Sequence, residues 1–242
     1  MDLRGRAALV TGAGQRVGRA IALALAARGM KVAVHYHGSE AGARETAELA
    51  ARAGGDGWTV RADLRRAEEA ERVVRDAAAH FGTLDVLVKS AAVMVRTPVA
   101  EVTPAQWDDM MAINLRAPFF CARAAAAVMG ARGGAIVNIA DLAAFERWAG
   151  YPVHVLSKSG VVVLTELLAR ALAPRIRVNA VAPGAVLPPD DWTAEARERL
   201  VATTPLRRLG APADVAAAVV YLLENDFVTG ETLVVDGGRR IR

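Results

Sequence analysis

Three side chains that can exchange protons, Asp141, His154 and Lys158, lie in one short stretch of the chain. His154 and Lys158 are four residues apart in a helix-like segment, so both project from one face of the expected helix. Tyr151 lies about one turn earlier, near the same face. Histidine can transfer a proton near neutral pH, and a neighbouring ammonium makes an acid easier to ionise. This pattern predicts a proton-transfer site, with Asp141 and Tyr151 also as candidate substrate contacts.

A glycine-containing turn follows the first apolar run and opens a helical pattern. It reads Thr11-Gly12-Ala13-Gly14-Gln15-Arg16-Val17-Gly18. Such a turn lets the backbone approach a pyrophosphate, which the free N–H groups of a helix N-terminus attract. The spacing departs from G-x-G-x-x-G, so a simple strand–helix turn would explain it equally well. Its place in a βαβ unit favours dinucleotide binding through Gly12, Gln15, Arg16 and Val17.

The end of the second expected strand indicates which dinucleotide is bound. NAD enzymes place a carboxylate there to hold the ribose hydroxyls. This chain reads His35-Tyr36-His37-Gly38-Ser39, with no carboxylate before Glu40. Histidines, the Ser39 hydroxyl and Arg16 would suit a 2′-phosphate, so NADPH is the expected cofactor. Alternatively, the segment is a polar turn with Ser39 as the helix N-cap. Asp63, at the end of the third strand, is positioned to hold an adenine amino group.

Short apolar runs alternate with helical patterns along the whole chain. The expected strands lie near 7–10, 32–34, 58–62, 86–88, 136–139, 178–181 and 233–235. The expected helices lie near 17–28, 40–53, 67–80, 104–129, 153–173, 193–201 and 212–224. This alternation is typical of an α/β protein with a parallel sheet and helices on both faces. The prediction is one Rossmann-type, doubly wound domain over residues 1–242.

Composition limits the classes of protein. The chain has 242 residues, 53% of them hydrophobic, and a net charge of +4 with only three lysines. Its arginines are scattered along helices, which disfavours nucleic-acid binding. Cys121 is the single cysteine, so no intrachain disulfide can form. No signal peptide, membrane span or metal-ligand cluster is expected, and we expect a soluble, cytoplasmic protein acting on a small molecule.

Taken together, these segments resemble the short-chain dehydrogenase/reductase family over essentially the whole chain. The resemblance is carried in order by the following segments: 11–18, Ala62-Asp63-Leu64, Asn114, Asn138-Ile139, Lys158, Pro183-Gly184 and Thr229-Gly230 through Asp236-Gly237-Gly238. Within the family the chain looks most like the pteridine reductase branch. An arginine in the nucleotide loop, the His35-Tyr36-His37 triplet and an aspartate in place of serine carry that finer resemblance.

The resemblance implies roles for further residues. Lys158 would hold the nicotinamide ribose, and Asn114 would position a water leading to the lysine. Met94 and Val186 would contact the substrate, covered by the loop 183–192 and the helix 193–201. The further cofactor contacts would be Ala62, Asp63, Leu64, Ser90, Ala91, Ala92, Ile139, Pro183 and Gly184. Helices 104–129 and 153–173 would form the interface of a homotetramer or homodimer, and the C-terminal arginines would reach a neighbouring subunit's site.

The chain departs from the family pattern at the residues that do chemistry. His154 stands in place of tyrosine and is either the proton donor or a hydrogen-bonded bystander beside the cofactor. Asp141 stands in place of serine; it either orients and protonates a nitrogen heterocycle or caps the loop after the fifth strand. Lys89, in Lys89-Ser90-Ala91-Ala92, replaces asparagine; it either adds positive charge near the cofactor or lies at a solvated strand end, which we expect. Met94 replaces a pterin-stacking aromatic and can cover a ring through its sulfur.

Three functions are compatible with this sequence. The first is an NADPH-dependent reductase that transfers hydride to a C=N or C=O bond, for example of a pterin or dihydrofolate-like heterocycle. The second is a catalytically silent NADP(H)-binding sensor or scaffold. The third is a carbonyl or 3-oxoacyl reductase with an atypical acid, and the carboxylate of Asp141 counts against it because an alkoxide would be repelled.

Overall fold

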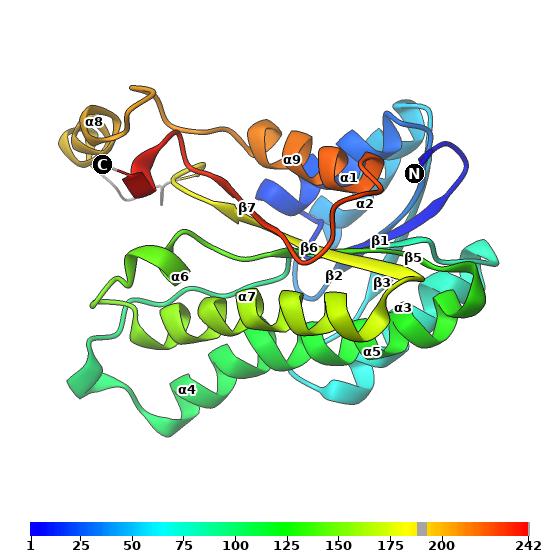
Figure 1. Cartoon of the computed structure of the whole chain (residues 1–242), viewed down its shortest axis with the longest axis horizontal. Coiled ribbons are helices and arrows are strands. Elements are labelled where there is room, and N and C mark those ends of the chain that lie inside the picture. The colour runs from blue at the N-terminus through cyan, green and yellow to red at the C-terminus, as the bar shows by residue number, and fades with distance from the viewer. Residues whose placement is uncertain (188–192, 242) are drawn as a thin grey trace.

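The computed structural model describes residues 1–187 and 193–241, which form a seven-stranded parallel sheet between two layers of helices (Figure 1). The strand order is β3-β2-β1-β4-β5-β6-β7. The strands are β1 (Ala7–Thr11), β2 (Lys31–Tyr36), β3 (Asp56–Arg61), β4 (Val86–Lys89), β5 (Gly134–Ile139), β6 (Ile176–Pro183) and β7 (Thr232–Val235). The predicted single-domain Rossmann-type fold is therefore confirmed for the described residues.

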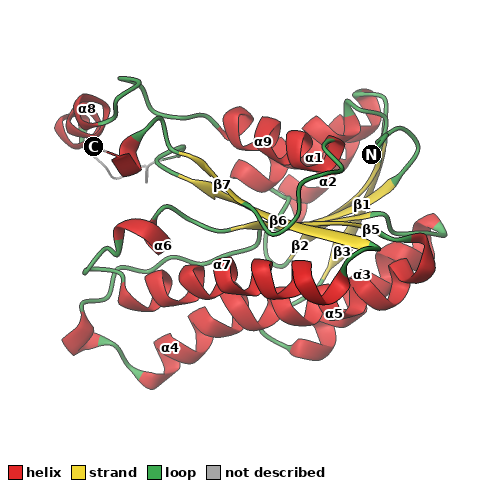
Figure 2. Cartoon of the chain, viewed as in Figure 1, coloured by secondary structure: helices red, strands yellow, loops and turns green. Residues whose placement is uncertain are grey.

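Each face of the sheet is covered by its own group of helices, as Figure 2 shows. On one face lie α1 (Arg16–Ala26), α2 (Glu40–Arg52) and α9 (Pro212–Glu224). On the other lie α3 (Ala67–Phe81), α5 (Ala117–Met129) and α7 (Pro152–Leu172). The strands alternate between these two cores: Val86 and Val88 of β4 face the first, and Leu87 faces the second. Burial on both faces explains why the strands read as unbroken apolar runs.

The order of the strands reverses between β1 and β4. Chain order runs outward from β1 through β2 to β3, then returns to β4 on the other side of β1. In open parallel sheets, ligands bind in the crevice at the carboxyl ends of the strands at this switch point. The expected nucleotide loop begins at the end of β1 and thus borders that crevice.

The expected helix 104–129 is interrupted. It consists of α4 (Pro104–Met111), a π-helical turn η2 (Ala112–Arg116) and α5. Thr103 begins α4 with a capping box to Gln106, in the pattern typical of helix starts. Asn114 lies inside the π-helical turn, and such turns are frequent at functional sites. The hydrophobic periodicity of the sequence did not reveal the interruption, because a single extra residue hardly disturbs it.

Smaller differences from the prediction concern connections. A short helix, α6 (Ala143–Glu146), follows Asp141 and was not expected; α8 (Ala194–Thr203) takes the place of the expected helix 193–201. Short 3-10 turns lie at Val99–Glu101 (η1), Gly130–Arg132 (η3) and Arg239–Ile241 (η4). Ser39 is at the N-cap position of α2, but among the described residues its side chain makes no capping hydrogen bond. Residues 188–192 of the expected substrate-covering loop, and Arg242, lie outside the described residues.

Candidate active site

A cavity of about 430 Å³ lies at the carboxyl ends of β1 to β4. Its lining includes many of the predicted cofactor residues: Gly12, Gln15, Arg16, Val17, His35, His37, Asp63, Leu64, Ser90, Ala91 and Ala92. Gly18, Arg65, Val93 and Ile113 also line it and were not predicted as contacts. Arg65 could have been noticed as a cation two residues after Asp63. Val93 and Ile113 carry no sequence signal beyond being apolar.

The glycines of the nucleotide loop are required by close backbone contacts. A Cβ on Gly12, whose φ is +65°, would lie 2.8 Å from the Cα of Ala91. A Cβ on Gly18 would lie 2.2 Å from the carbonyl oxygen of Gly12. The loop is therefore folded tightly against the end of β4, and the N-terminus of α1 opens beside the cavity. This cradle, with the cations Arg16 and Arg65 on its lining, fits a dinucleotide phosphate group.

His35 has a different role from the one expected of it. It is only 2% exposed; its Nδ1 accepts a hydrogen bond from the Gly12 N–H at 3.0 Å, and its Nε2 lies 3.1 Å from the Ala62 carbonyl oxygen, to which it donates. Burial lowers the pKa of His35 to about 4, although the hydrogen bond to Ala62 opposes this. The expectation that His35 contacts the 2′-phosphate is wrong, because the backbone engages both of its ring nitrogens. His35 instead holds the nucleotide loop against β3, and the exposed His37 remains a candidate phosphate contact.

Arg16 extends from the nucleotide loop across to the loop after β6. Its φ of +54° is unusual for a residue with a side chain, and its Nη2 donates to the Leu187 carbonyl oxygen at 2.9 Å. Arg16 thus connects the cofactor cavity to the start of the expected substrate-covering loop. Tyr36 and Ser39, both half-buried, follow from β2 but are not among the residues that line the cavity.

The proton-transfer residues meet at the carboxyl end of β5. His154 lies on α7 and is 2% exposed; its Nε2 is 3.5 Å from Oδ2 of Asp141, which follows β5. Lys158, one turn further along α7, donates from Nζ to the Ile139 carbonyl oxygen at 2.8 Å. Burial lowers the pKa of Lys158 to about 8, and the charge of Asp141 opposes that shift. The sequence prediction that these three side chains lie together is supported by this geometry.

Asp141 combines two roles that the sequence left as alternatives. Its Oδ1 accepts a hydrogen bond from the Ala143 N–H at 2.7 Å and so caps the turn into α6. Its Oδ2 faces His154. One carboxylate oxygen is structural and the other is free to take part in chemistry.

A hydrogen-bond network around Val93 fixes the His154 ring. Asn114 accepts from the Val93 N–H and donates to the Val93 carbonyl oxygen, both at 2.9 Å. The Asn114 amide also donates to the Ser157 hydroxyl at 3.0 Å, which in turn donates to the His154 carbonyl oxygen at 2.8 Å. The Nδ1 of His154 lies 3.3 Å from the Val93 carbonyl oxygen. Ser157 was missed by the sequence prediction, although its place between His154 and Lys158 could have drawn attention to it.

This network selects one tautomer of His154. A carbonyl oxygen only accepts hydrogen bonds, so Nδ1 must carry the proton that points at Val93. In the neutral ring, Nε2 then has a lone pair directed at the Asp141 carboxylate. Nε2 is buried and has no hydrogen-bond partner among the described residues. Two acceptors that face one another are stabilised by a proton between them, so the His154–Asp141 pair is built to hold one proton.

Lys89 is not at a solvated strand end, and that expectation is wrong. It is 4% exposed at the end of β4, and its Nζ donates to the Pro118 carbonyl oxygen at 2.8 Å. Burial lowers its pKa to about 7, partly opposed by the neighbouring Cys121. Lys89 lies on the same face of the sheet as Leu87, and the start of α5 covers it there. Lys89 joins the sheet to the start of α5 and does not line the nucleotide cavity.

The remaining predicted residues are less closely grouped. Met94, in the loop after β4, is 47% exposed. Val186 lines a separate cavity of about 300 Å³ beside β7. Tyr151 lies at the N-cap position of α7, not within the helix, and packs edge-on against Trp148. Pro183 and Gly184 lie at the end of β6, where Gly184 donates to the Val235 carbonyl oxygen at 2.9 Å.

Two of the C-terminal arginines, Arg239 and Arg240, contact their own chain; that the C-terminus also reaches a neighbouring subunit's site stays a prediction. Arg239 pairs with Glu146 of α6, and the guanidinium of Arg240 lies over the Phe145 ring at 4.9 Å. Across residues 1–187 and 193–241, no helix is long and apolar enough to span a membrane. In the same residues, no group of three or more histidine, cysteine, aspartate or glutamate side chains could hold a metal ion.

Comparison with known proteins agrees with this architecture. The family profile described as enoyl-(acyl carrier protein) reductase matches residues 12–240. A 3-oxoacyl-[acyl-carrier-protein] reductase of Staphylococcus aureus is 36% identical, over 96% of this chain and 97% of the relative. A 3beta-hydroxysteroid dehydrogenase of Eggerthella lenta is also 36% identical, over 98% and 94%.

Solved structures lead to the same family. A putative short-chain alcohol dehydrogenase from Sinorhizobium meliloti has a TM-score of 0.94 and 37% identity, covering 98% of this chain and 97% of that one. A short-chain dehydrogenase/reductase from Serratia marcescens has a TM-score of 0.93 and 34% identity, covering 99% and 100%. The chain therefore belongs to the short-chain dehydrogenase/reductase family of nicotinamide-dependent oxidoreductases.

Proposed function

We propose that this chain is an NADPH-dependent reductase in which the His154–Asp141 pair supplies the proton that accompanies hydride transfer to a C=N or C=O bond. One observation carries the proposal. The buried Nε2 of His154 faces Asp141 Oδ2 at 3.5 Å, while Nδ1 is held by the Val93 carbonyl oxygen. A bystander histidine would have both ring nitrogens satisfied by the protein.

The preference for NADPH is supported by the charges around the cavity. Arg16, His37 and Arg65 line it, and no carboxylate lies at the end of β2. Glu40, the first carboxylate after β2, is exposed and paired with Arg44 of the same helix. A 2′-phosphate would meet the guanidinium groups of Arg16 and Arg65 here, and the carboxylate of Asp63, which also lines the cavity, is paired with Arg65. NADPH, when bound, supplies the hydride.

The chain's own residues then handle the proton. As negative charge develops on the substrate nitrogen or oxygen, the His154–Asp141 pair releases its single proton to that atom. Solvent afterwards returns a proton to the pair, which restores its resting state. Lys158, fixed on the Ile139 carbonyl oxygen, places a positive charge beside the pair. Asn114 keeps Val93, and through it the His154 ring, in position.

The substrate class follows from the carboxyl group. An N–H-bearing heterocycle such as a pterin or dihydrofolate could donate to Asp141 and receive its proton on a ring nitrogen. A second candidate is a 3-oxoacyl or other ketone substrate, which is favoured by the name of the 36% identical Staphylococcus aureus relative. For a ketone, the proton of the pair must already lie on the substrate side before the alkoxide forms.

NADPH oxidation across a panel of substrates separates these alternatives. The panel should contain dihydropterins, dihydrofolate, 3-oxoacyl thioesters and simple ketones. Turnover of the heterocycles alone would support the first substrate class, and turnover of thioesters or ketones alone would support the second. NADPH binding measured by nicotinamide fluorescence, with no turnover of any substrate, would show a catalytically silent protein and refute the proposal.

His154→Tyr tests the acid directly on the same panel. If His154 is the reason that ketones are poor substrates, His154→Tyr should reduce ketones faster than wild type. Its dissociation constant for NADPH should stay within about twofold of wild type. His154→Phe removes the proton altogether. Unchanged turnover in His154→Phe would rule out the proposed role of the pair.

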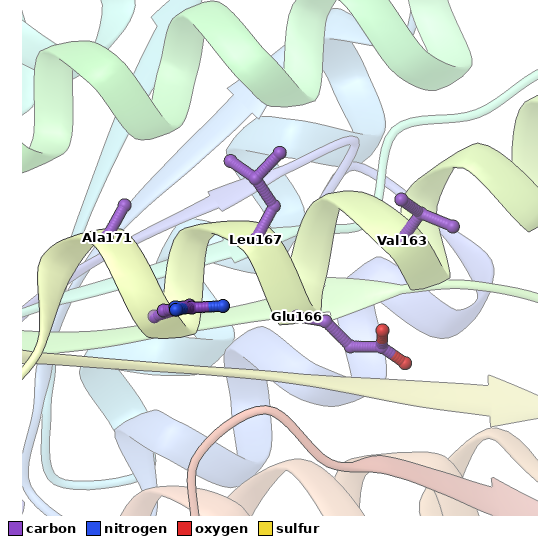
Figure 3. Close-up of a pocket in the computed structure, with 5 residues that line it drawn as sticks. Val163, Glu166, Leu167 and Ala171 are labelled. Atoms are coloured by element: carbon purple, nitrogen blue, oxygen red, sulfur yellow. The ribbon is translucent and has the colours of Figure 1, made fainter.

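We also propose that a second copy of the chain covers the outer face of α7 and the helices beside it. Val163 and Leu167 are 61% and 55% exposed, and Figure 3 shows them with Ala171 along one side of α7. Phe119 of α5 is 41% exposed and borders the same groove as Leu167. Exposed apolar groups gathered in this way mark interfaces. Leu167→Glu should shift the protein towards monomers in sedimentation velocity, whereas Leu167→Met should not; a wild-type monomer would contradict the assembly.

A further inference from the structure

The end of the chain folds back onto the segment that follows Asp141. At the end of β7, Asp236 accepts hydrogen bonds from the Gly238 N–H at 2.8 Å and from the Arg240 N–H at 2.7 Å. Gly237 and Gly238 both have positive φ, which lets the chain turn sharply there. The turn directs Arg239 towards α6. Figure 1 places α6 and this C-terminal turn, η4, at the same end of the molecule.

Arg239 forms a shielded ion pair with Glu146. Its Nε lies 3.2 Å and 3.4 Å from the two carboxylate oxygens, and the two side chains are 16% and 17% exposed. Among the ion pairs between described residues, only this one and His154–Asp141 leave both partners less than a quarter exposed. A pair shielded from water is screened little by salt and restricts the geometry of its partners more than a surface pair does.

Glu146 connects this ion pair to both members of the proton pair. On one side, α6 follows Asp141 directly, and Asp141 Oδ1 caps its first turn through the Ala143 N–H. On the other side, Glu146 Oε2 accepts from the Trp148 Nε1–H at 2.6 Å, and Trp148 packs against Tyr151 at the start of α7. His154 lies in the first turn of α7. The loop between Asp141 and His154 is therefore held at its middle by Arg239.

We propose that Arg239 is a positioning residue for proton transfer, acting through Glu146 to keep Asp141 Oδ2 opposite His154 Nε2. The inference rests on the proposed function in one respect, namely that this pair delivers the proton. Asp141, on the segment after β5, is paired with His154, and Lys158 lies one turn further along α7. Neither touches Arg239 directly, so the effect of Arg239 is carried by the position of the loop.

Arg239→Met tests this proposal, because it removes the charge and keeps most of the side-chain length. We expect kcat to fall about tenfold to a hundredfold, since a misplacement of about 1 Å can have that effect. The dissociation constant for NADPH should stay within about twofold, because the nucleotide cavity does not include this turn. The pH–rate profile should be displaced, and Arg239→Lys should restore part of the loss.

A second measurement does not depend on activity. In the cofactor-free protein, the ring resonances of His154, assigned with His154→Phe, should move at fixed pH in Arg239→Met and in Glu146→Gln. Arg28→Met is the matched control, because Arg28 pairs with Glu224 at the opposite ends of the strands and both partners are about half exposed. It should leave kcat and the His154 resonances unchanged.

The outcomes separate the two proposals. If Arg239→Met lowers only the melting temperature and leaves kcat and the His154 resonances as in the control, Arg239 is merely structural and the inference is overturned. If Arg239→Met does not fold, kcat and the His154 resonances are compared between Glu146→Gln and the control instead. If the wild-type protein turns over no substrate, the proposed function fails, but the resonances still decide whether the C-terminal turn positions His154.

Discussion

Two of the four histidines are buried to the same extent, one at each end of the expected cofactor site, and they differ in their partners. His35 and His154 are each 2% exposed. At the nucleotide end, both ring nitrogens of His35 are engaged by the backbone, at Gly12 and Ala62. At the catalytic end, only Nδ1 of His154 has a backbone partner, and Nε2 faces the carboxylate of Asp141.

The difference shows that burial alone does not define the role of a histidine. A ring with one donor and one acceptor partner is fixed in its neutral form and holds the two backbone segments that it bonds. A ring with one nitrogen directed at a carboxylate can hold a proton and give it up. The hydrogen-bond partners, not the residue type or its exposure, decide which histidine can do chemistry.

Substitution of His154 should have the largest effect. His154→Leu and His154→Gln should both lower kcat by about 10²–10⁴-fold, because neither side chain can transfer a proton. Nicotinamide fluorescence should show little change in NADPH affinity. The amide of glutamine replaces the hydrogen-bonding groups but not the acid. A kcat of His154→Gln close to that of wild type would therefore show that His154, like His35, has only a structural role.

The stability of the protein should depend on pH through His35. Its pKa is about 4 in the folded protein and 6.5 in an unfolded chain, so the unfolded chain binds the proton more readily between these values. The contribution is therefore fully present above about pH 6.5 and is lost as the pH falls towards 4, by about 3 kcal/mol in total. Urea unfolding at pH 7, 5.5 and 4.5 measures it as the difference between wild type and His35→Gln. Parallel pH curves for the two proteins would contradict the assignment.

Substitution of His35 should act on the nucleotide loop and not on chemistry. His35→Leu leaves the Gly12 N–H and the Ala62 carbonyl oxygen without a partner, which should cost about 1–3 kcal/mol of unfolding free energy. A weakening of NADPH binding by about tenfold corresponds to about 1.4 kcal/mol of this. His35→Gln, with one acceptor and one donor, should restore most of the loss. If His35→Leu and His35→Gln lower the unfolding free energy and NADPH affinity equally, the hydrogen bonds of His35 do not explain its role, and the contrast with His154 fails.

Lys89 provides a test of burial without a charged partner. Its pKa of about 7 lies below the 10.5 of an unfolded chain, so the unfolded state binds more protons between these values. Stability should therefore rise as the pH increases from 7 to 10.5. Lys89→Met should remove this rise and stabilise the protein at pH 7 by about 1 kcal/mol. The control, Lys31→Met at the edge of β2, should retain the rise, and a destabilised Lys89→Met would contradict the account.

Much of the fold followed from the sequence, because apolar periodicity is a local property. The expected strand and helix positions agree with the structure to within a few residues, and the parallel sheet with helices on both faces is observed as predicted. The π-helical turn around Asn114 and the short helix α6 were not visible, since neither changes the local pattern enough. The solvated position expected for Lys89 was wrong because the start of α5, at Pro118, covers the end of β4 and buries this side chain.

The sequence by itself determined the nucleotide loop and the shared helix face of His154 and Lys158, since helical spacing and strand ends follow from local order, and the resemblance to the family added Asp141 to this group. Only the tertiary structure decided that His35 is neutral and holds the nucleotide loop through two backbone hydrogen bonds. It also decided that the Val93 carbonyl oxygen selects the tautomer of His154 and that Arg239 reaches Glu146. These contacts join segments 23 to 93 residues apart. Hydrogen-bond partners across such distances depend on how the layers pack, and no local pattern in the sequence encodes them.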